Sequence, residues 1–162
     1  MVDFLNRLGS TFGSFPSSPN LLEEYQPSGE VFRNYNGINT IRSAIGADEK
    51  LLSVYSKLVE TVVIPQLKAL IVAAEGNSSK EHIFYYQYPP TLRLQSGPSK
   101  QHGRSHRDAE YGHQQGEINF WMPLTYYSKT QTTLFVEDVP ESNIFHPLMV
   151  DYGSIGKFHG TS

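Results

Sequence analysis

The clearest pattern along the chain is a series of apolar residues at helical spacing between residues 48 and 75. Because they recur three or four positions apart, they fall on one broad stripe that faces a partner surface. Asp48 is suited to cap the amino end of this helix, and Gly76 is suited to end it. Pro65 lies inside the pattern and predicts a kink or a break near Ile64. The stripe consists of Leu51, Leu52, Tyr55, Leu58, Val59, Val62, Val63, Leu67, Leu70 and Ile71.

After residue 76 the residue pattern changes. Short segments rich in aromatic and β-branched residues, or with alternating apolar and polar residues, predict strands. Turn-forming residues separate these segments. In the segment that starts at Glu117, alternation places Asn119 and Trp121 on the same face as Glu117. The expected strands are H-I-F-Y-Y-Q-Y (82–88), T-L-R-L-Q (91–95), E-I-N-F-W-M-P-L-T (117–125), T-L-F-V-E-D (133–138) and F-H-P-L-M-V-D-Y (145–152).

Helices followed by turn-linked strands predict an α+β fold, with an antiparallel sandwich or barrel and helices packed outside it. Residues 1–40 are punctuated by Gly, Ser, Pro and Asn, which predicts an irregular N-terminal arm. We therefore expect two parts, an arm over residues 1–40 and a domain over residues 41–162 that contains the helical support and the strands.

Composition narrows the chemistry of any site. The chain has 162 residues, a net charge of −3 and no cluster of Lys and Arg, which argues against a nucleic-acid partner. It has no cysteine, so disulfides, zinc–thiolate sites, iron–sulfur clusters and thiol nucleophiles are excluded, and a metal must be held by imidazole, carboxylate or water. No apolar run is long enough to cross a bilayer, and residues 1–13 do not resemble a signal peptide. We expect a soluble cytoplasmic protein without a membrane partner.

The segment S-H-R-D-A-E-Y-G-H (105–113) carries the strongest sign of metal chemistry. On a strand, His106 and Asp108 would point to the same side and could bind one ion together. A mononuclear non-haem iron site uses two histidines and one carboxylate. The tripeptide H-R-D is too short to be specific, and a histidine and an aspartate in a polar surface loop remain an alternative interpretation.

The residues around this tripeptide are more specific. H-R-D-A-E-Y-G-H-Q-Q-G-E-I-N-F-W-M-P-L-T (106–125) is followed by L-F-V-E (134–137), by P-L (147–148) and by G-S-I-G-K-F-H-G (153–160). In order and spacing, this series resembles the Fe(II)/2-oxoglutarate-dependent dioxygenases, in the branch of phytanoyl-CoA-hydroxylase-like and streptomycin-biosynthesis proteins. The resemblance covers about residues 82–162. It implies a double-stranded β-helix, or jelly roll, with helices outside it, and a hydroxylase of a small molecule that uses Fe(II) and 2-oxoglutarate.

The resemblance also implies roles for individual residues. His106 and Asp108 correspond to the first two iron ligands. Asn119 corresponds to a position that contacts 2-oxoglutarate or substrate, and Trp121 to a residue of the pocket wall. Arg93 points opposite to its leucine neighbours and could reach a carboxylate, although an ordinary exposed arginine is an equal alternative.

The third iron ligand of this family lies a few residues beyond the F-x-G motif, which here is Phe158-His159-Gly160, and an arginine for 2-oxoglutarate follows it. Both positions would fall beyond Ser162, so we expect a jelly roll that is incomplete at the C-terminus, in a fragment or a shortened form. His159 is an alternative third ligand. His113 is less favoured as a ligand than as a neighbouring contact, because A-E-Y-G predicts a turn. An open strand edge predicts self-association.

Two other classes of function remain open at this point. A cupin-like metal-binding protein or isomerase would use a similar β-helix, although cupins usually carry a histidine where this chain has Asp108. A non-catalytic fragment would instead act through its open strand edge. The sequence does not indicate which small molecule is the substrate.

Overall fold

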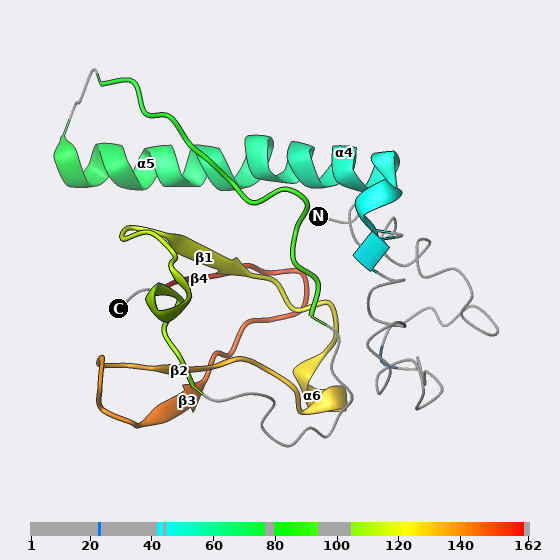
Figure 1. Ribbon diagram of the computed structural model, residues 1–162, viewed down its shortest axis with the longest axis vertical. Helices are drawn as coiled ribbons and strands as arrows, with labels where there is room; N and C mark the ends of the chain where they lie inside the picture. Colours follow the sequence, from blue (N-terminus) through cyan, green and yellow to red (C-terminus); the bar gives the residue numbers. More distant parts are fainter. Residues whose placement is uncertain (1–22, 24–41, 44, 77–79, 94–104, 161–162) are drawn as a thin grey trace. The chain divides into compact units, whose positions relative to one another are not determined.

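The computed structural model describes residues 23, 42–43, 45–76, 80–93 and 105–160. Within them the chain has a mixed α+β structure, with one long helix and two small antiparallel sheets of two strands each (Figure 1). This confirms the predicted α+β class. The chain divides into two compact units, one formed by Met1–Ser18 with Gln26–Arg93 and the other by Pro19–Tyr25 with Leu94–Ser162. Apart from Glu23, the predicted arm over residues 1–40 lies outside the described residues.

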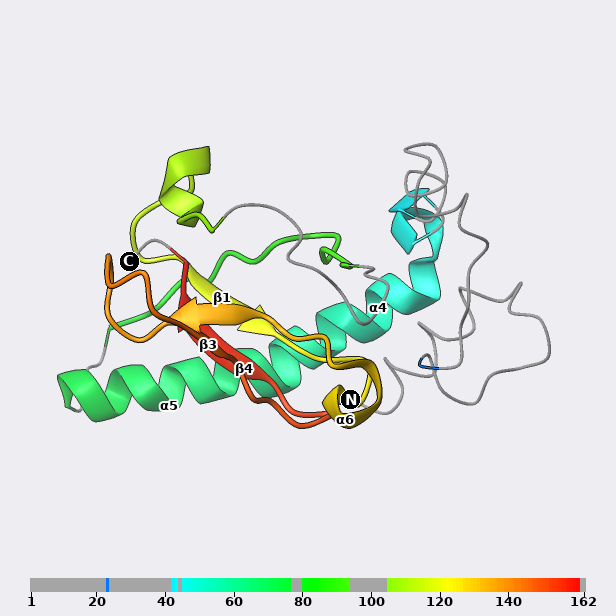
Figure 2. The same ribbon diagram turned by 90° about the horizontal axis from the view of Figure 1, so that it is seen from below.

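The long helix of the first unit confirms the strongest prediction from the sequence (Figure 2). Its amino end is capped by Asp48, whose Oδ1 accepts a hydrogen bond of 2.8 Å from the Leu51 backbone N–H. Its carboxyl end is followed by Gly76, which has a φ of 76°, a conformation that glycine adopts without steric cost. The helix consists of α4 (Glu49–Leu58), the π-helical turn η2 (Val59–Val63) and α5 (Ile64–Glu75).

At the place where a kink or a break was expected, near Ile64, the structure has the π-helical turn η2, and the helix continues through Pro65. Proline has no N–H, and its ring crowds the carbonyl four residues earlier, which here belongs to Thr61. A π-helical turn changes the hydrogen-bonding pattern by one residue at the place where proline disrupts it. The helix therefore accommodates Pro65 without ending.

Only the first half of the apolar stripe is buried. Leu51 is completely buried, and Leu70 on α5 is 50% exposed. Among the described residues, α5 contributes no buried side chain. The stripe therefore forms a core around α4 and the start of η2, and its second half remains partly exposed. The buried core consists of Ile45, Leu51, Leu52, Leu58 and Val59.

The strands predicted at 82–88 and 91–95 are wrong over the described residues 82–93, which form no strand. This segment is instead attached to α4, where the Tyr55 hydroxyl donates a hydrogen bond of 2.8 Å to the Gln87 carbonyl. The Tyr55 ring also contacts the ring of Tyr86, with centroids 6.0 Å apart. A strand needs a neighbouring strand to form hydrogen bonds with its backbone N–H and C=O groups. Aromatic side chains have no such requirement and can pack on a helix. Burial, and to a smaller extent Tyr86, raises the pKa of Tyr55.

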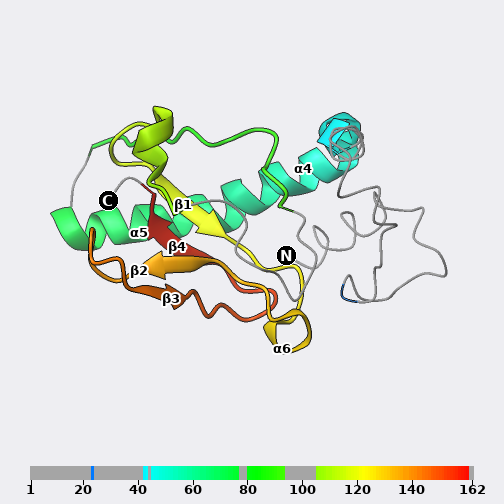
Figure 3. The same ribbon diagram turned by 60° about the horizontal axis from the view of Figure 1, so that its bottom comes forward.

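The second unit contains the strands, which are shorter than predicted (Figure 3). The predicted strands over 117–125, 133–138 and 145–152 are confirmed over part of their length. The last strand of the chain lies in the motif over 153–160, where no strand was predicted. Prolines at 123 and 147 limit two of them, since proline cannot donate to a ladder. Antiparallel pairs form between β1 (Ile118–Trp121) and β4 (Gly156–His159), and between β2 (Phe135–Glu137) and β3 (Phe145–Pro147), with a short helix α6 (Tyr127–Thr130) between β1 and β2.

These two pairs do not close into a jelly roll within the part of the chain that the structure describes. None of the described helices combines the length and the apolar character that crossing a membrane requires.

Candidate metal site

The segment around His106 turns and forms no strand, so His106 and Asp108 do not have the strand spacing considered above. Asp108 is the first residue of a short 3₁₀ helix, η3 (Asp108–Tyr111). The Arg107 backbone N–H donates a hydrogen bond of 3.0 Å to the Glu110 carboxylate, which satisfies a donor at the start of this helix. Gly112 follows η3 with a φ of 83°, a left-handed conformation that reverses the chain.

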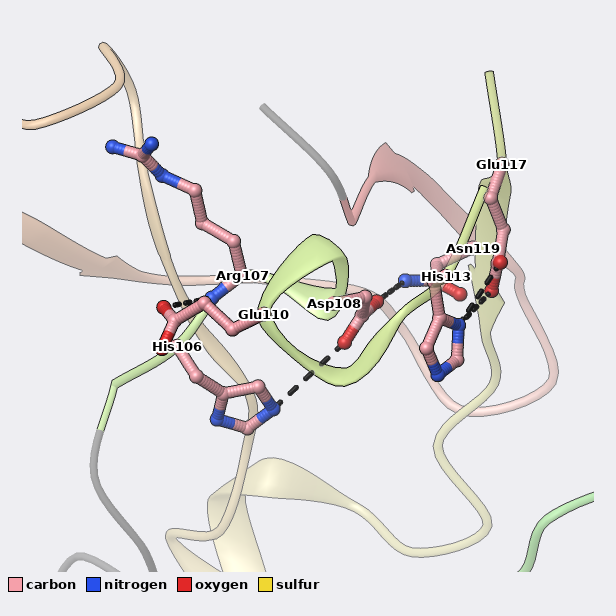
Figure 4. Close-up of polar contacts among 7 residues, drawn as sticks. All are labelled: His106, Arg107, Asp108, Glu110, His113, Glu117 and Asn119. Atoms are coloured by element: carbon pink, nitrogen blue, oxygen red, sulfur yellow. Dashed lines mark hydrogen bonds and ion pairs between the residues drawn. The ribbon is translucent and has the colours of Figure 1, made fainter. Parts of the chain in front are cut away.

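His106 and Asp108 nevertheless come close to each other, as predicted, because His106 Nε2 lies 3.8 Å from Asp108 Oδ1 (Figure 4). With metal–ligand bonds of about 2.1 Å, two ligands of one octahedral ion lie about 3.0 Å apart when adjacent and about 4.2 Å apart when opposite. The observed separation lies between these values. At this separation a small shift of either side chain would let both atoms reach one metal ion.

The second carboxylate oxygen of Asp108 is held by Asn119, whose Nδ2 donates a hydrogen bond of 2.5 Å to Asp108 Oδ2. The Asp108 backbone N–H donates to the Gly160 carbonyl at 2.6 Å. Asn119 lies on β1 opposite Phe158 of β4, so this ladder brings both segments to Asp108. The sequence predicted that Asn119 contacts 2-oxoglutarate or substrate. The structure adds a role in orienting Asp108.

Gly160, the glycine of the F-x-G motif, approaches the Asp108 side chain so closely that no larger residue fits. A Cβ atom added to Gly160 would collide with the Asp108 carboxylate and with the amide nitrogen of Asn119. The motif therefore has a physical explanation, because only glycine leaves room for the hydrogen bond between Asn119 and Asp108.

A group of three potential ligands, which includes Asp108, gathers on the same turn. One donor atom each from Asp108, His113 and Glu117 lies within 4.8 Å of the other two, a group that can hold a metal ion. His113 Nδ1 lies 2.8 Å and 2.9 Å from the two carboxylate oxygens of Glu117. This hydrogen bond is the main cause that raises the pKa of His113, with desolvation opposing it and the charges of Glu117 and Asp108 adding to it.

The remaining predicted site residues lie elsewhere. Trp121 lies on β1 opposite Gly156 and on the same face as Asn119. His159 is exposed and lies opposite Ile118. Since directly opposed residues of an antiparallel pair point to one face, His159 and Asn119 lie on opposite faces of the ladder. The structure does not bring His159 to the group around Asp108. Arg93 is exposed and belongs to the other unit.

Arg107, the middle residue of the tripeptide, links this turn to the loop between β2 and β3. Its guanidinium lies 3.0 Å from the Glu141 carboxylate. Within that loop, the carboxylate of Glu137 accepts hydrogen bonds from the backbone N–H groups of Glu141 at 3.1 Å and Asn143 at 2.7 Å. The glutamate of the L-x-V-E motif therefore shapes the loop that Arg107 contacts.

Glu117 was not among the predicted ligands, and His113 was favoured as a neighbouring contact. The turn predicted for A-E-Y-G is confirmed, and His113 lies near both Asp108 and Glu117. Gly112 and Gly116 both have left-handed backbones, with φ values of 83° and 85°. These two glycines were the signal that the chain folds back and returns His113 and Glu117 to Asp108.

Comparison with known proteins gives one informative relative. The chain is 32% identical over 101 residues to the streptomycin biosynthesis protein StrG of Streptomyces griseus. The aligned region covers 62% of this chain and 46% of StrG, so it spans less than half of that relative. No protein-family model matches the chain. No solved structure matches it.

Proposed function

We propose that the chain is part of an Fe(II)/2-oxoglutarate-dependent oxygenase that hydroxylates a small molecule. The observation that carries this proposal is the meeting of three separated motifs at one carboxylate. Asp108 of H-x-D accepts a hydrogen bond from Asn119 of E-x-N-F-W and donates its N–H to Gly160 of F-x-G. The partial similarity to StrG, a biosynthesis protein by its name, is consistent with chemistry on a small molecule.

In this proposal His106 and Asp108 hold Fe(II). His106 Nε2 and Asp108 Oδ1 are 3.8 Å apart, close enough for both to bind one ion. Together with 2-oxoglutarate and dioxygen, the iron supplies the oxidation of a substrate C–H bond, with succinate and CO2 as the other products. Asn119 fixes Asp108 Oδ2 and leaves Oδ1 directed toward His106. This division of the carboxylate keeps one oxygen for the metal and one for orientation.

The proposed co-substrate contacts are Arg93, Asn119 and Trp121. Asn119 and Trp121 share one face of β1, which would form a wall next to the metal. Arg93 would supply the positive charge that a carboxylate of 2-oxoglutarate requires. We also propose that the β1–β4 and β2–β3 pairs belong to a jelly roll, since antiparallel pairs of this kind are its building units.

Fe(II) binding to the 162-residue chain under argon, measured by titration with and without 2-oxoglutarate, tests this function. We expect 2-oxoglutarate to tighten Fe(II) binding on the order of tenfold, because a co-substrate that chelates the metal is coupled to it. His106→Ala should remove this effect. His146→Ala is the matched control, since His146 is also an exposed histidine beside a carboxylate, 3.2 Å from Asp138.

Equal Fe(II) affinity with and without 2-oxoglutarate would rule out the proposed oxygenase. That result would favour a cupin-like metal protein if Fe(II) still binds. A loss of the 2-oxoglutarate effect in His146→Ala as well as in His106→Ala would show that the effect does not arise at the proposed site.

A further inference from the structure

We propose that Asp108, His113 and Glu117 form a site for a divalent transition-metal ion that requires neither 2-oxoglutarate nor His106. The three donors come from ten consecutive residues, 108–117, and one atom of each lies within 4.8 Å of the others. This inference shares Asp108 with the proposed oxygenase but does not depend on that activity.

The backbone holds the three donors together before any metal binds. The His113 N–H donates to the Asp108 carbonyl at 3.3 Å, and the Glu117 N–H donates to the Gln114 carbonyl at 3.3 Å. The first bond closes the turn that follows η3, and the second closes the turn that contains Gly116. Two successive closed turns therefore bring the backbone of Glu117 back toward Asp108, whose side chain Asn119 orients.

The distances suit metal ligands. His113 Nδ1 lies 2.8 Å and 2.9 Å from the two Glu117 oxygens, close to the edge of about 3.0 Å between adjacent ligands of an octahedral ion. Asp108 lies farther away, within the limit of 4.8 Å. Its side chain is 23% exposed and that of His113 is 44% exposed, so an ion from solvent can reach both.

The charges of the three groups also suit a divalent cation. Two carboxylates and one neutral imidazole give a net charge of −2, and a metal would take the place of the hydrogen bond between His113 and Glu117. One imidazole with two carboxylates is a ligand set for ions such as Mn²⁺, Fe²⁺ or Zn²⁺. Asn119 already orients the Asp108 carboxylate at 2.5 Å, as groups behind metal ligands commonly do.

His106 is not part of this donor set. Figure 4 draws His106 and His113 on either side of Asp108, and the group of close donor atoms contains His113 and not His106. Asp108 is therefore common to the pair with His106 and to the group of three with His113 and Glu117. Substitutions at His106 and at His113 separate the two sites experimentally.

Mn²⁺ binding to the full chain, measured by isothermal titration calorimetry without 2-oxoglutarate, tests the inference. We expect one Mn²⁺ per chain. His113→Ala and Glu117→Gln should each weaken binding on the order of 10–100-fold. His146→Ala should bind Mn²⁺ as the unsubstituted chain does, and His106→Ala should lose less affinity than His113→Ala. Circular dichroism of each variant checks that its helix and strands are retained.

Absence of Mn²⁺ binding to the unsubstituted chain would overturn the inference, as would unchanged affinity in both His113→Ala and Glu117→Gln. A loss in His106→Ala equal to that in His113→Ala would also overturn it, because the two histidines would then serve one site. The proposed oxygenase fails by a different result, the lack of a 2-oxoglutarate effect on Fe(II), so the two failures are distinguishable.

Discussion

Replacing Gly160 with alanine is expected to weaken metal binding at Asp108 on the order of 10–100-fold, the usual cost of losing a group that orients a ligand. The added Cβ would collide with the Asp108 carboxylate and with the Asn119 amide, and it would lie 2.9 Å from Asp108 Cγ. Asp108 must therefore turn away from Asn119 and lose the hydrogen bond of 2.5 Å that holds it. Calorimetric titration with Mn²⁺ and with Fe(II) measures the change.

Gly46→Ala is the matched control, since a Cβ at Gly46 meets no atom within 4 Å. It makes the same chemical change at an open position and should leave metal affinity unchanged. Unchanged affinity in Gly160→Ala, with Gly46→Ala behaving as expected, would show that the close approach of Gly160 does not position Asp108.

Replacing Leu51 with alanine is expected to lower the free energy of unfolding by about 2–5 kcal/mol, the largest effect on stability that we expect. Leu51 is completely buried beside the other core residues of α4, so the substitution leaves a cavity and removes apolar contacts. Chemical denaturation followed by circular dichroism measures the difference, and a lower midpoint with an unchanged slope identifies a loss of stability.

Leu70→Ala makes the same substitution on α5, where the side chain is 50% exposed. The expected change is within about 0.5 kcal/mol, as for most surface positions. Equal losses in Leu51→Ala and Leu70→Ala would contradict the finding that only the first half of the apolar stripe is buried, and would mean that α5 is covered in solution.

The helix was predictable because its signals are local. Apolar spacing, the cap at Asp48 and the stop at Gly76 all act within a few residues, and the structure agrees with each of them. The segment over 82–93 was not predictable in this way. Its aromatic pattern suits a strand, but a strand also needs a partner, and the tyrosines instead attach the segment to α4. Local pattern does not reveal which surface a segment will meet.

The candidate site was also predictable only in part, where its signals are local. The motif around His106 and Asp108 identified two side chains that the structure places 3.8 Å apart. The role of Gly160 depends on the pairing of β1 with β4, a contact between residues about forty positions apart, which a motif marks but does not explain. His113 and Glu117 depend on the left-handed turns at two glycines, and the direction of such a turn is not evident from residue types alone.

The iron content of the purified chain and of Asp108→Ala, measured after anaerobic loading with Fe(II) and removal of free metal, tests the central claim most directly. Asp108 belongs both to the pair with His106 and to the group with His113 and Glu117, and Asn119 and Gly160 orient it. We predict one iron per chain for the unsubstituted protein and almost none for Asp108→Ala, with circular dichroism showing that the variant keeps its fold. Equal iron content in the two proteins would contradict a metal site centred on Asp108.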